Sequence, residues 1–185
     1  SDVLTLNGLT INANGAAGAS GGNAFLKTSG TGLQTLGVSD LQASGGSGGS
    51  VRFEVANFNA NGSTTLTSNA ISDGSKAGTI DIVLSKANAL NVVQAKASNT
   101  SASTGDGGTV NVTVDAGFAI NVDNTSGDRL ELEANAGTLE GNAGTVDLKT
   151  NSQVNYNSSG LRLAAGTDVG NGGILSIVTS IDPMV

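Results

Sequence analysis

A short motif returns along this chain about every 30 residues, and it constrains the fold more than any other feature. The motif is a glycine, one further residue that is usually small, and then alternating aliphatic side chains. Its anchor glycines are 27, 29, 30, 36 and 29 residues apart. A fixed period of this kind indicates a repeat architecture. The six copies read Gly22-Asn-Ala-Phe-Leu-Lys, Gly49-Ser-Val-Arg-Phe-Glu, Gly78-Thr-Ile-Asp-Ile-Val, Gly108-Thr-Val-Asn-Val-Thr, Gly144-Thr-Val-Asp-Leu-Lys and Gly173-Ile-Leu-Ser-Ile-Val.

Aligning the six copies separates apolar from mostly polar positions. Side chains alternate between the two faces of a strand, so this separation predicts sheets with one buried face. One predicted inward column is Ala24, Val51, Ile80, Val110, Val146 and Leu175. The next inward column is Leu26, Phe53, Ile82, Val112, Leu148 and Ile177. The predicted outward column between them is Phe25, Arg52, Asp81, Asn111, Asp147 and Ser176.

The period and the number of strands per copy predict the fold class. Each copy holds about three short strands, and a period near 30 is shorter than a propeller blade of about 40–45 residues. We therefore expect an all-β parallel β-helix, or β-solenoid, of about six coils. It forms a single domain over residues 1–185, with coil starts near 1, 22, 49, 78, 108, 144 and 173. The alternative is an antiparallel β-sandwich, whose hairpins would close at the Asn-Gly steps.

One window allows a second interpretation of its secondary structure. Val83–Ala97 contains good helix formers at a loose helical spacing. It also continues the coil pattern, with Leu90 and Val92 facing inward. We expect strands here.

Composition excludes several classes of function. The chain has no His, Cys or Trp, so it has no histidine relay, thiolate nucleophile, disulfide or Cys/His zinc site. Its net charge is −7, which disfavours nucleic-acid binding. No apolar run is long enough to span a membrane. The start has no basic and apolar leader, so we expect a signal peptide to be absent or already removed. We expect no cofactor.

The two ends of the predicted solenoid are candidate sites of self-association. No amphipathic helix caps either end, and the last strand is apolar on both faces, which normally means that both faces are covered. The cover is either the C-terminal tail from Ile181 to Val185, or another copy or more of a longer chain. Head-to-tail contacts that do not close produce filaments. The candidate residues are Val3, Leu4, Leu6, Leu9, Ile11, Ile174, Leu175, Ile177, Val178 and Ile181.

Two stretches resemble a known family of secreted proteins. The phrase GDGGTVNVTV (105–114) and the longer LELEANAGTLEGNAGTVDLKT (130–150) are similar to repeats of the filamentous-haemagglutinin-type exoproteins of Gram-negative bacteria and cyanobacteria. The likeness covers most of residues 22–179, at the level of the repeating pattern of residue types. It implies a right-handed parallel β-helix, export from the cell, and a role as a surface adhesin or extracellular fibre.

Candidate chemistry is sparse. Glycoside hydrolysis needs two carboxylates about 5–9.5 Å apart, and Glu131 and Glu133 point the same way on one strand beside Arg129. We interpret them as outward charges on a solvated sheet face. The weak metal candidates are Asp123 and Asp128, whose Gly-containing loop offers oxygen ligands to calcium. The same residues are also ordinary turn formers.

These observations predict a non-catalytic extracellular structural protein. We expect a subunit of a surface fibre or an adhesin whose main partner is itself, as a head-to-tail homopolymer. Surface glycans, or the surface of a host or neighbouring cell, are further candidate partners. The alternative is a carbohydrate-binding or polysaccharide-cleaving β-helix module, and a third class is a spacer within a giant exoprotein.

Overall fold

The chain winds into a stack of parallel coils, as the repeat predicts. Every element that the structure describes is a strand, and all the strand pairs are parallel. The antiparallel β-sandwich alternative is therefore wrong. The computed structural model describes residues 3–89, 92–100, 104–116, 120–122, 129–151, 154–156 and 161–179.

Three faces make up each coil. The first face holds β3 (Asn23–Thr28), β6 (Ser50–Val55), β10 (Thr79–Ala89), β13 (Thr109–Ala116), β16 (Thr145–Thr150) and β19 (Ile174–Thr179). The second holds β1 (Leu4–Leu6), β4 (Gln34–Leu36), β7 (Phe58–Ala60), the end of β10, β14 (Ile120–Val122) and β17 (Val154–Tyr156). The third holds β2 (Leu9–Asn12), β5 (Ser39–Gln42), β8 (Ser63–Thr67), β11 (Val92–Lys96), β15 (Arg129–Glu133) and β18 (Leu161–Ala164).

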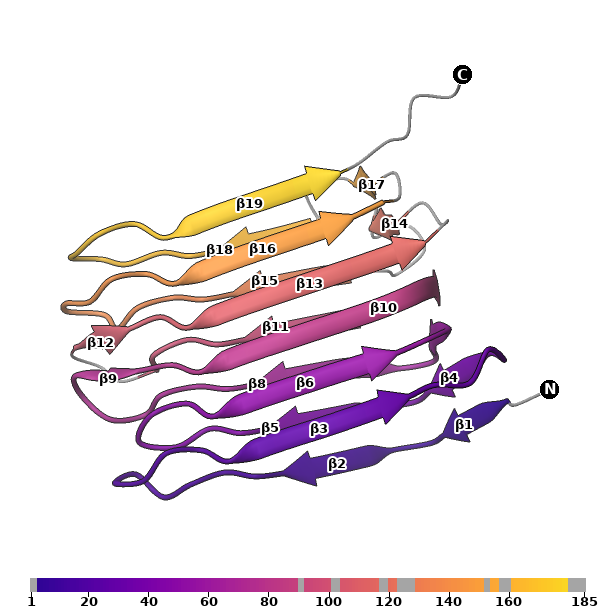
Figure 1. Cartoon of the computed structure of the whole chain (residues 1–185). Coiled ribbons are helices and arrows are strands. Elements are labelled where there is room, and N and C mark those ends of the chain that lie inside the picture. Colours follow the sequence, from indigo (N-terminus) through magenta and orange to yellow (C-terminus); the bar gives the residue numbers. More distant parts are fainter. Residues whose placement is uncertain are drawn as a thin grey trace.

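The direction of the strands gives the coil its hand. In Figure 1 the first-face strands run one way on the near side, and the third-face strands run back behind them as the chain climbs from β2 to β19. The coil is therefore right-handed. Two short strands, β9 (Ser75–Lys76) and β12 (Gly105–Asp106), pair where the third face turns back towards the first.

The strand register confirms the predicted columns. Ala24 pairs with Val51, and the column continues through Ile80, Val110, Val146 and Leu175. Leu26 and Phe25 head the second inward column and the outward column in the same register. The five coil steps are therefore the 27, 29, 30, 36 and 29 residues expected from the anchor glycines.

The window Val83–Ala97 forms strands, with residues 90 and 91 outside the described residues. One prediction within it is wrong, because Val93 rather than Val92 is buried in the core. Val93 pairs with Thr64 and Leu130, and both of these side chains are buried. The alternation therefore changes by one residue between Leu84 and Val93, and within β10 the register shifts between Ala87 and Ala89. Leu90 was the other predicted inward residue, and it lies outside the described part.

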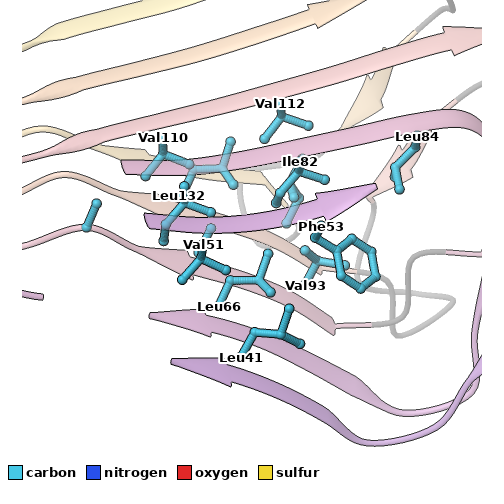
Figure 2. Packing of buried hydrophobic residues seen from close by; sticks show 14 of the residues in the cluster. Leu41, Val51, Phe53, Leu66, Ile82, Leu84, Val93, Val110, Val112 and Leu132 are labelled. Atoms are coloured by element: carbon cyan, nitrogen blue, oxygen red, sulfur yellow. The ribbon is translucent and has the colours of Figure 1, made fainter. Parts of the chain in front are cut away.

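The core is a narrow aliphatic column between the first and third faces. Figure 2 shows Val51, Ile82 and Val110 from the first face approaching Leu41, Leu66 and Leu132 from the third. All of these side chains are buried. Phe53 and Phe58 meet edge to face, with ring centroids 5.5 Å apart and an interplanar angle of 89°. Burial of this apolar surface is the main stabilising contribution to the stack.

The anchor glycines stand where consecutive coils approach most closely. In each coil step, the residue after the upper glycine donates its N–H to the carbonyl of the lower glycine, as Thr145 does to Gly108 over 2.9 Å. A Cβ at five of the six anchors would lie within 3.0 Å of backbone in the coil below, which real Cβ atoms do not tolerate. This close approach is the physical reason why the motif begins with glycine. The five are Gly49, Gly78, Gly108, Gly144 and Gly173.

A hydrogen-bonded ladder of Asn and Ser side chains runs along the corner after the third face. In each step a side-chain oxygen accepts the backbone N–H of the equivalent residue one coil further on. The distances in order are 2.7, 3.0, 3.0, 3.0 and 2.9 Å. The ladder therefore satisfies backbone donors at the corner and ties each coil to the next. Its members are Asn14, Ser44, Asn69, Ser98, Asn135 and finally the N–H of Gly166.

Candidate functional site at the open ends of the solenoid

The C-terminal end of the described solenoid is the strand β19. It pairs with β16 on one side, and no described strand pairs with its other edge. Leu175 and Ile177 stand in the two inward columns, yet they are 52% and 47% exposed because no described coil covers them. On the outward side Ile174 and Val178 are 64% and 50% exposed. The last strand therefore presents apolar side chains on both faces.

The N-terminal end exposes one strand edge on each face. Within the described residues, β1 pairs only with β4, β2 only with β5, and β3 only with β6. Leu6, Leu9 and Ile11 pack against the core but stay half-buried. This end therefore presents the backbone donors and acceptors of its edge strands beside an incompletely covered core. Such an edge can pair with another strand.

A hollow of about 260 Å³ opens at the N-terminal end between the first and second faces. Val3 and Leu4 line one side of it, and Lys27 lines another. Gln34 closes it from inside, where its Nε2 donates to the carbonyl of Gly30 and its Oε1 accepts from Thr28 Oγ1, each at 2.5 Å. The hollow is part of the open end rather than a pocket in the side of the rod.

The predicted self-association residues fall at these two ends. Leu4, Leu6, Leu9 and Ile11 lie on β1 and β2, with Val3 just before β1, and Ile174, Leu175, Ile177 and Val178 lie on β19. Ile181 lies outside the described residues. Sequence reasoning missed Phe25 and Leu26 of β3, which also form the N-terminal edge. The available signal was that the first copy of the motif begins at Gly22, which makes β3 the first described strand of the first face.

Charges on the first face form ion pairs. Lys27 Nζ lies 2.6 Å from Glu54 Oε1, and Arg52 Nη2 lies 3.1 Å from Glu54 Oε2. Hydrogen bonding to Lys27 above all, and then to Arg52, holds the pKa of Glu54 below its ordinary value. Lys149 Nζ lies 2.5 Å from Asp147 Oδ2, and this contact is the main reason why the pKa of Asp147 is also lowered.

Glu131 and Glu133 do not lie on a solvated surface, so that expectation is wrong. They are 6% and 9% exposed and alternate with the core residues Leu130 and Leu132. Glu131 forms an ion pair with Arg129 and accepts a 2.7 Å hydrogen bond from Gln94. Glu133 lies 3.9 Å from Lys96. Burial is tolerated because each carboxylate has a cationic neighbour, with an amide donor in addition at Glu131.

The metal candidates Asp123 and Asp128 lie outside the described residues. Asp106 lies beside a shallow groove, where its Oδ1 accepts the backbone N–H of Asn142 over 2.8 Å. Among the residues that the structure describes, no group of three or more Asp or Glu side chains could hold a metal ion.

Comparisons with protein-family models, with curated proteins and with solved structures gave no match. In the described part of the chain, no helix is long and apolar enough to cross a membrane. The open ends are therefore the feature from which a function can be argued.

Proposed function

We propose that this chain is a non-catalytic structural protein that assembles head to tail into a filament. The observation that carries the proposal is the exposure of core-column side chains at the end of the stack. Leu175 and Ile177 lie in register with Val146 and Leu148, which are completely buried. Covering them with another coil extends the same core, and the apolar area removed from water drives association.

The strand edges at the two ends support the same proposal. Unpaired edges of parallel sheets are templates for further strands, and natural proteins usually block them with charges, bulges or a covering element. No described element covers β19 at one end or β1, β2 and β3 at the other. The contact is heterologous, because one end meets the other. Each copy would stack on the last along the axis of the rod, so the assembly propagates into a fibre rather than closing into a ring.

The sides of the rod fit a structural role better than a catalytic one. The carboxylates of Glu54, Asp147, Glu131 and Glu133 each have a cationic neighbour within 4.0 Å. For the polysaccharide-cleaving alternative the candidate carboxylates were Glu131 and Glu133, and their burial leaves them poorly placed to flank a sugar. The resemblance to filamentous-haemagglutinin-type exoproteins supports an extracellular location, as a surface fibre or adhesin.

Assembly of the purified chain tests this function directly. We expect sedimentation velocity to show concentration-dependent growth, and negative-stain microscopy to show unbranched filaments. Deleting residues 173–185 should give soluble chains that do not polymerise. A second variant, Leu175→Asp, places a charge on the exposed core column without shortening the chain.

Leu139→Asp is the matched control for this experiment. Leu139 is also an exposed leucine, but it lies in the corner segment between β15 and β16 rather than at an end. This variant should assemble like the parent chain, and circular dichroism should show the same β content for all variants. A parent chain that stays monomeric at high concentration would contradict the proposal. Filaments that persist in both end variants would do so as well.

A further inference from the structure

The apolar outward side chains of the first face are concentrated at its two terminal strands. In the four inner strands the outward positions are polar or charged except for Val83. In β3 the central outward residue is Phe25, which is 52% exposed, and in β19 two outward residues are Ile174 and Val178. Single exposed apolar residues are common on protein surfaces, but their concentration on the two terminal strands of this face is what contact with a partner at both ends would require.

At each end of the stack the strands of the three faces stop at different levels, and the offsets at the two ends are complementary. Within the described residues each face holds six strands, with β10 shared by the first and second faces, but the first described strand, β1, is on the second face and the last, β19, is on the first face. A second copy placed on β19 would set its β1 above β17, its β2 above β18 and its β3 above β19. All three faces then continue at once, with a rise of roughly 29 Å per copy for strands spaced about 4.8 Å apart.

Gly22 provides an independent observation. At the other five anchors, a Cβ would collide with the coil below. Gly22 has no described coil below it, and a Cβ there would meet the carbonyl oxygen of Ala13 at 3.2 Å, a tight contact but much milder than the collisions at the other five anchors. The chain nevertheless keeps glycine at this position. A coil stacked beneath Gly22 would impose the same close approach that the other five anchors experience.

We propose that β19 of one copy pairs in parallel with β3 of the next copy, in the register set by the anchor glycines. This proposal rests on the head-to-tail assembly proposed above and specifies its contact. Gly173 would lie beneath Gly22, and the N–H of Asn23 would donate to the Gly173 carbonyl. The same bond joins every internal step, with N–O distances between 2.9 and 3.0 Å.

This register continues both the core and the outer surface. Leu175 lies under Ala24 and Ile177 under Leu26, so both inward columns run on without a break. On the outside, Phe25 faces Ser176 and is flanked diagonally by Ile174 and Val178. Aromatic side chains reach such diagonal neighbours on a sheet. On the third face, Leu161 and Leu163 of β18 take the register positions beneath Leu9 and Ile11 of the next copy.

Disulfide cross-linking tests the register, and the chain is suited to it because it contains no cysteine. Asn23→Cys and Ile174→Cys chains are mixed under oxidising conditions, as are Lys27→Cys and Val178→Cys chains. Both pairs are in register, so their Cα atoms should lie about 5 Å apart, within the range that a disulfide spans. The matched controls exchange the partners, because Asn23→Cys with Val178→Cys is four residues out of register, roughly 13 Å along the strand.

We expect disulfide-linked dimers from the two in-register mixtures and at least about tenfold less from the two exchanged mixtures. If filaments form but the exchanged mixtures cross-link equally well, the register is wrong while the proposed assembly stands. If all four mixtures remain monomeric and uncross-linked under assembly conditions, both proposals fail.

Gly22→Ala separates an effect on the contact between copies from an effect on the stability of the monomer. The variant should lower the thermal midpoint in dilute solution far less than Gly144→Ala does, since within its own chain the Cβ asks the carbonyl of Ala13, 3.2 Å away, to shift by only a few tenths of an ångström. It should raise the critical concentration for assembly about tenfold or more, because the Cβ collides with the neighbouring copy. Gly18→Ala, where a Cβ meets nothing within 4 Å, is the control and should change neither quantity. Unaltered assembly of Gly22→Ala would overturn the proposed register.

Discussion

Ser98 Oγ accepts the backbone N–H of Asn135 over 3.0 Å, although the two residues are 37 positions apart. The backbone N–H of Ser98 in turn donates to Asn69 Oδ1, also over 3.0 Å. Ser98 is therefore the middle of a ladder in which each coil satisfies a backbone donor of the next. The bond spans the longest coil step, so the ladder keeps the corner in register where the coil contains extra residues.

Ser98→Ala should lower the free energy of unfolding by about 1–3 kcal/mol. The substitution leaves the N–H of Asn135 without its acceptor at a corner shielded from water. Chemical denaturation monitored by circular dichroism measures the loss. Ser85→Ala, at an exposed position of β10, is the control and should stay within about 0.5 kcal/mol of the parent. An equal effect of both substitutions would contradict a role for the ladder.

Gly144→Ala should be markedly destabilising, by about 1–3 kcal/mol or more. A Cβ at Gly144 would collide with backbone atoms of Gly107 and Gly108, so the two coils would have to separate. Thermal unfolding of dilute protein would reveal the change as a lower midpoint. Gly18→Ala adds the same methyl group in open space and should leave the midpoint unchanged. A parent-like midpoint for Gly144→Ala would show that close coil approach is not what requires glycine.

Acid should weaken the fold through the paired carboxylates of the first face. Lys149 holds the pKa of Asp147 below its ordinary value of 3.8, and Lys27 holds that of Glu54 below 4.5. A lowered folded-state pKa adds stability that is complete above the ordinary value and disappears as the pH falls through the folded-state value. The free energy of unfolding should therefore decline as the pH drops below about 4.5.

Asp147→Asn and Lys149→Met should each flatten part of this acid-dependent decline. Lys149 is 59% exposed and Asp147 is 18% exposed, so solvent still screens the pair and the effect of either should stay below about 1 kcal/mol at neutral pH. The double variant should behave like either single one, because each removes the same ion pair. Denaturation curves recorded between pH 2.5 and 7 measure how the free energy of unfolding of each variant depends on pH. Fully additive effects of the two substitutions would show that the pair makes no contribution.

Leu148 and Ile177 stand in the same column, one coil apart, and should respond differently to truncation. Leu148 is fully buried, and Leu148→Ala should cost about 2–5 kcal/mol at any protein concentration. Ile177→Ala should cost clearly less in dilute protein, because its side chain is half exposed. Its cost should then grow with concentration as neighbouring copies cover it. A concentration-independent cost would argue that Ile177 is not buried by assembly.

Local sequence was sufficient for the alternation of the first face and for the anchor glycines. Phe53, Ile82 and Val112 were placed correctly because strand side chains alternate with a period of two, which any aligned repeat reveals. Val92 was placed wrongly because the simple alternation of β10 does not continue into β11, and a register shift such as that between Ala87 and Ala89 cannot be read from a period of two. Glu131 and Glu133 were expected in solvent because alternation gives the side of a strand but not what packs around it.

The sequence by itself determined the repeat lengths and the apolar last strand and favoured the solenoid over the β-sandwich, since all three follow from a period and its alternation. Only the tertiary structure decided which backbone groups each Asn and Ser of the corner satisfies. It also decided that β3, with Phe25, forms an edge that pairs with no described strand other than β6. The physical reason is that contacts between coils depend on which residues stack at a spacing of about 4.8 Å, and that stacking is settled only when the whole chain is wound.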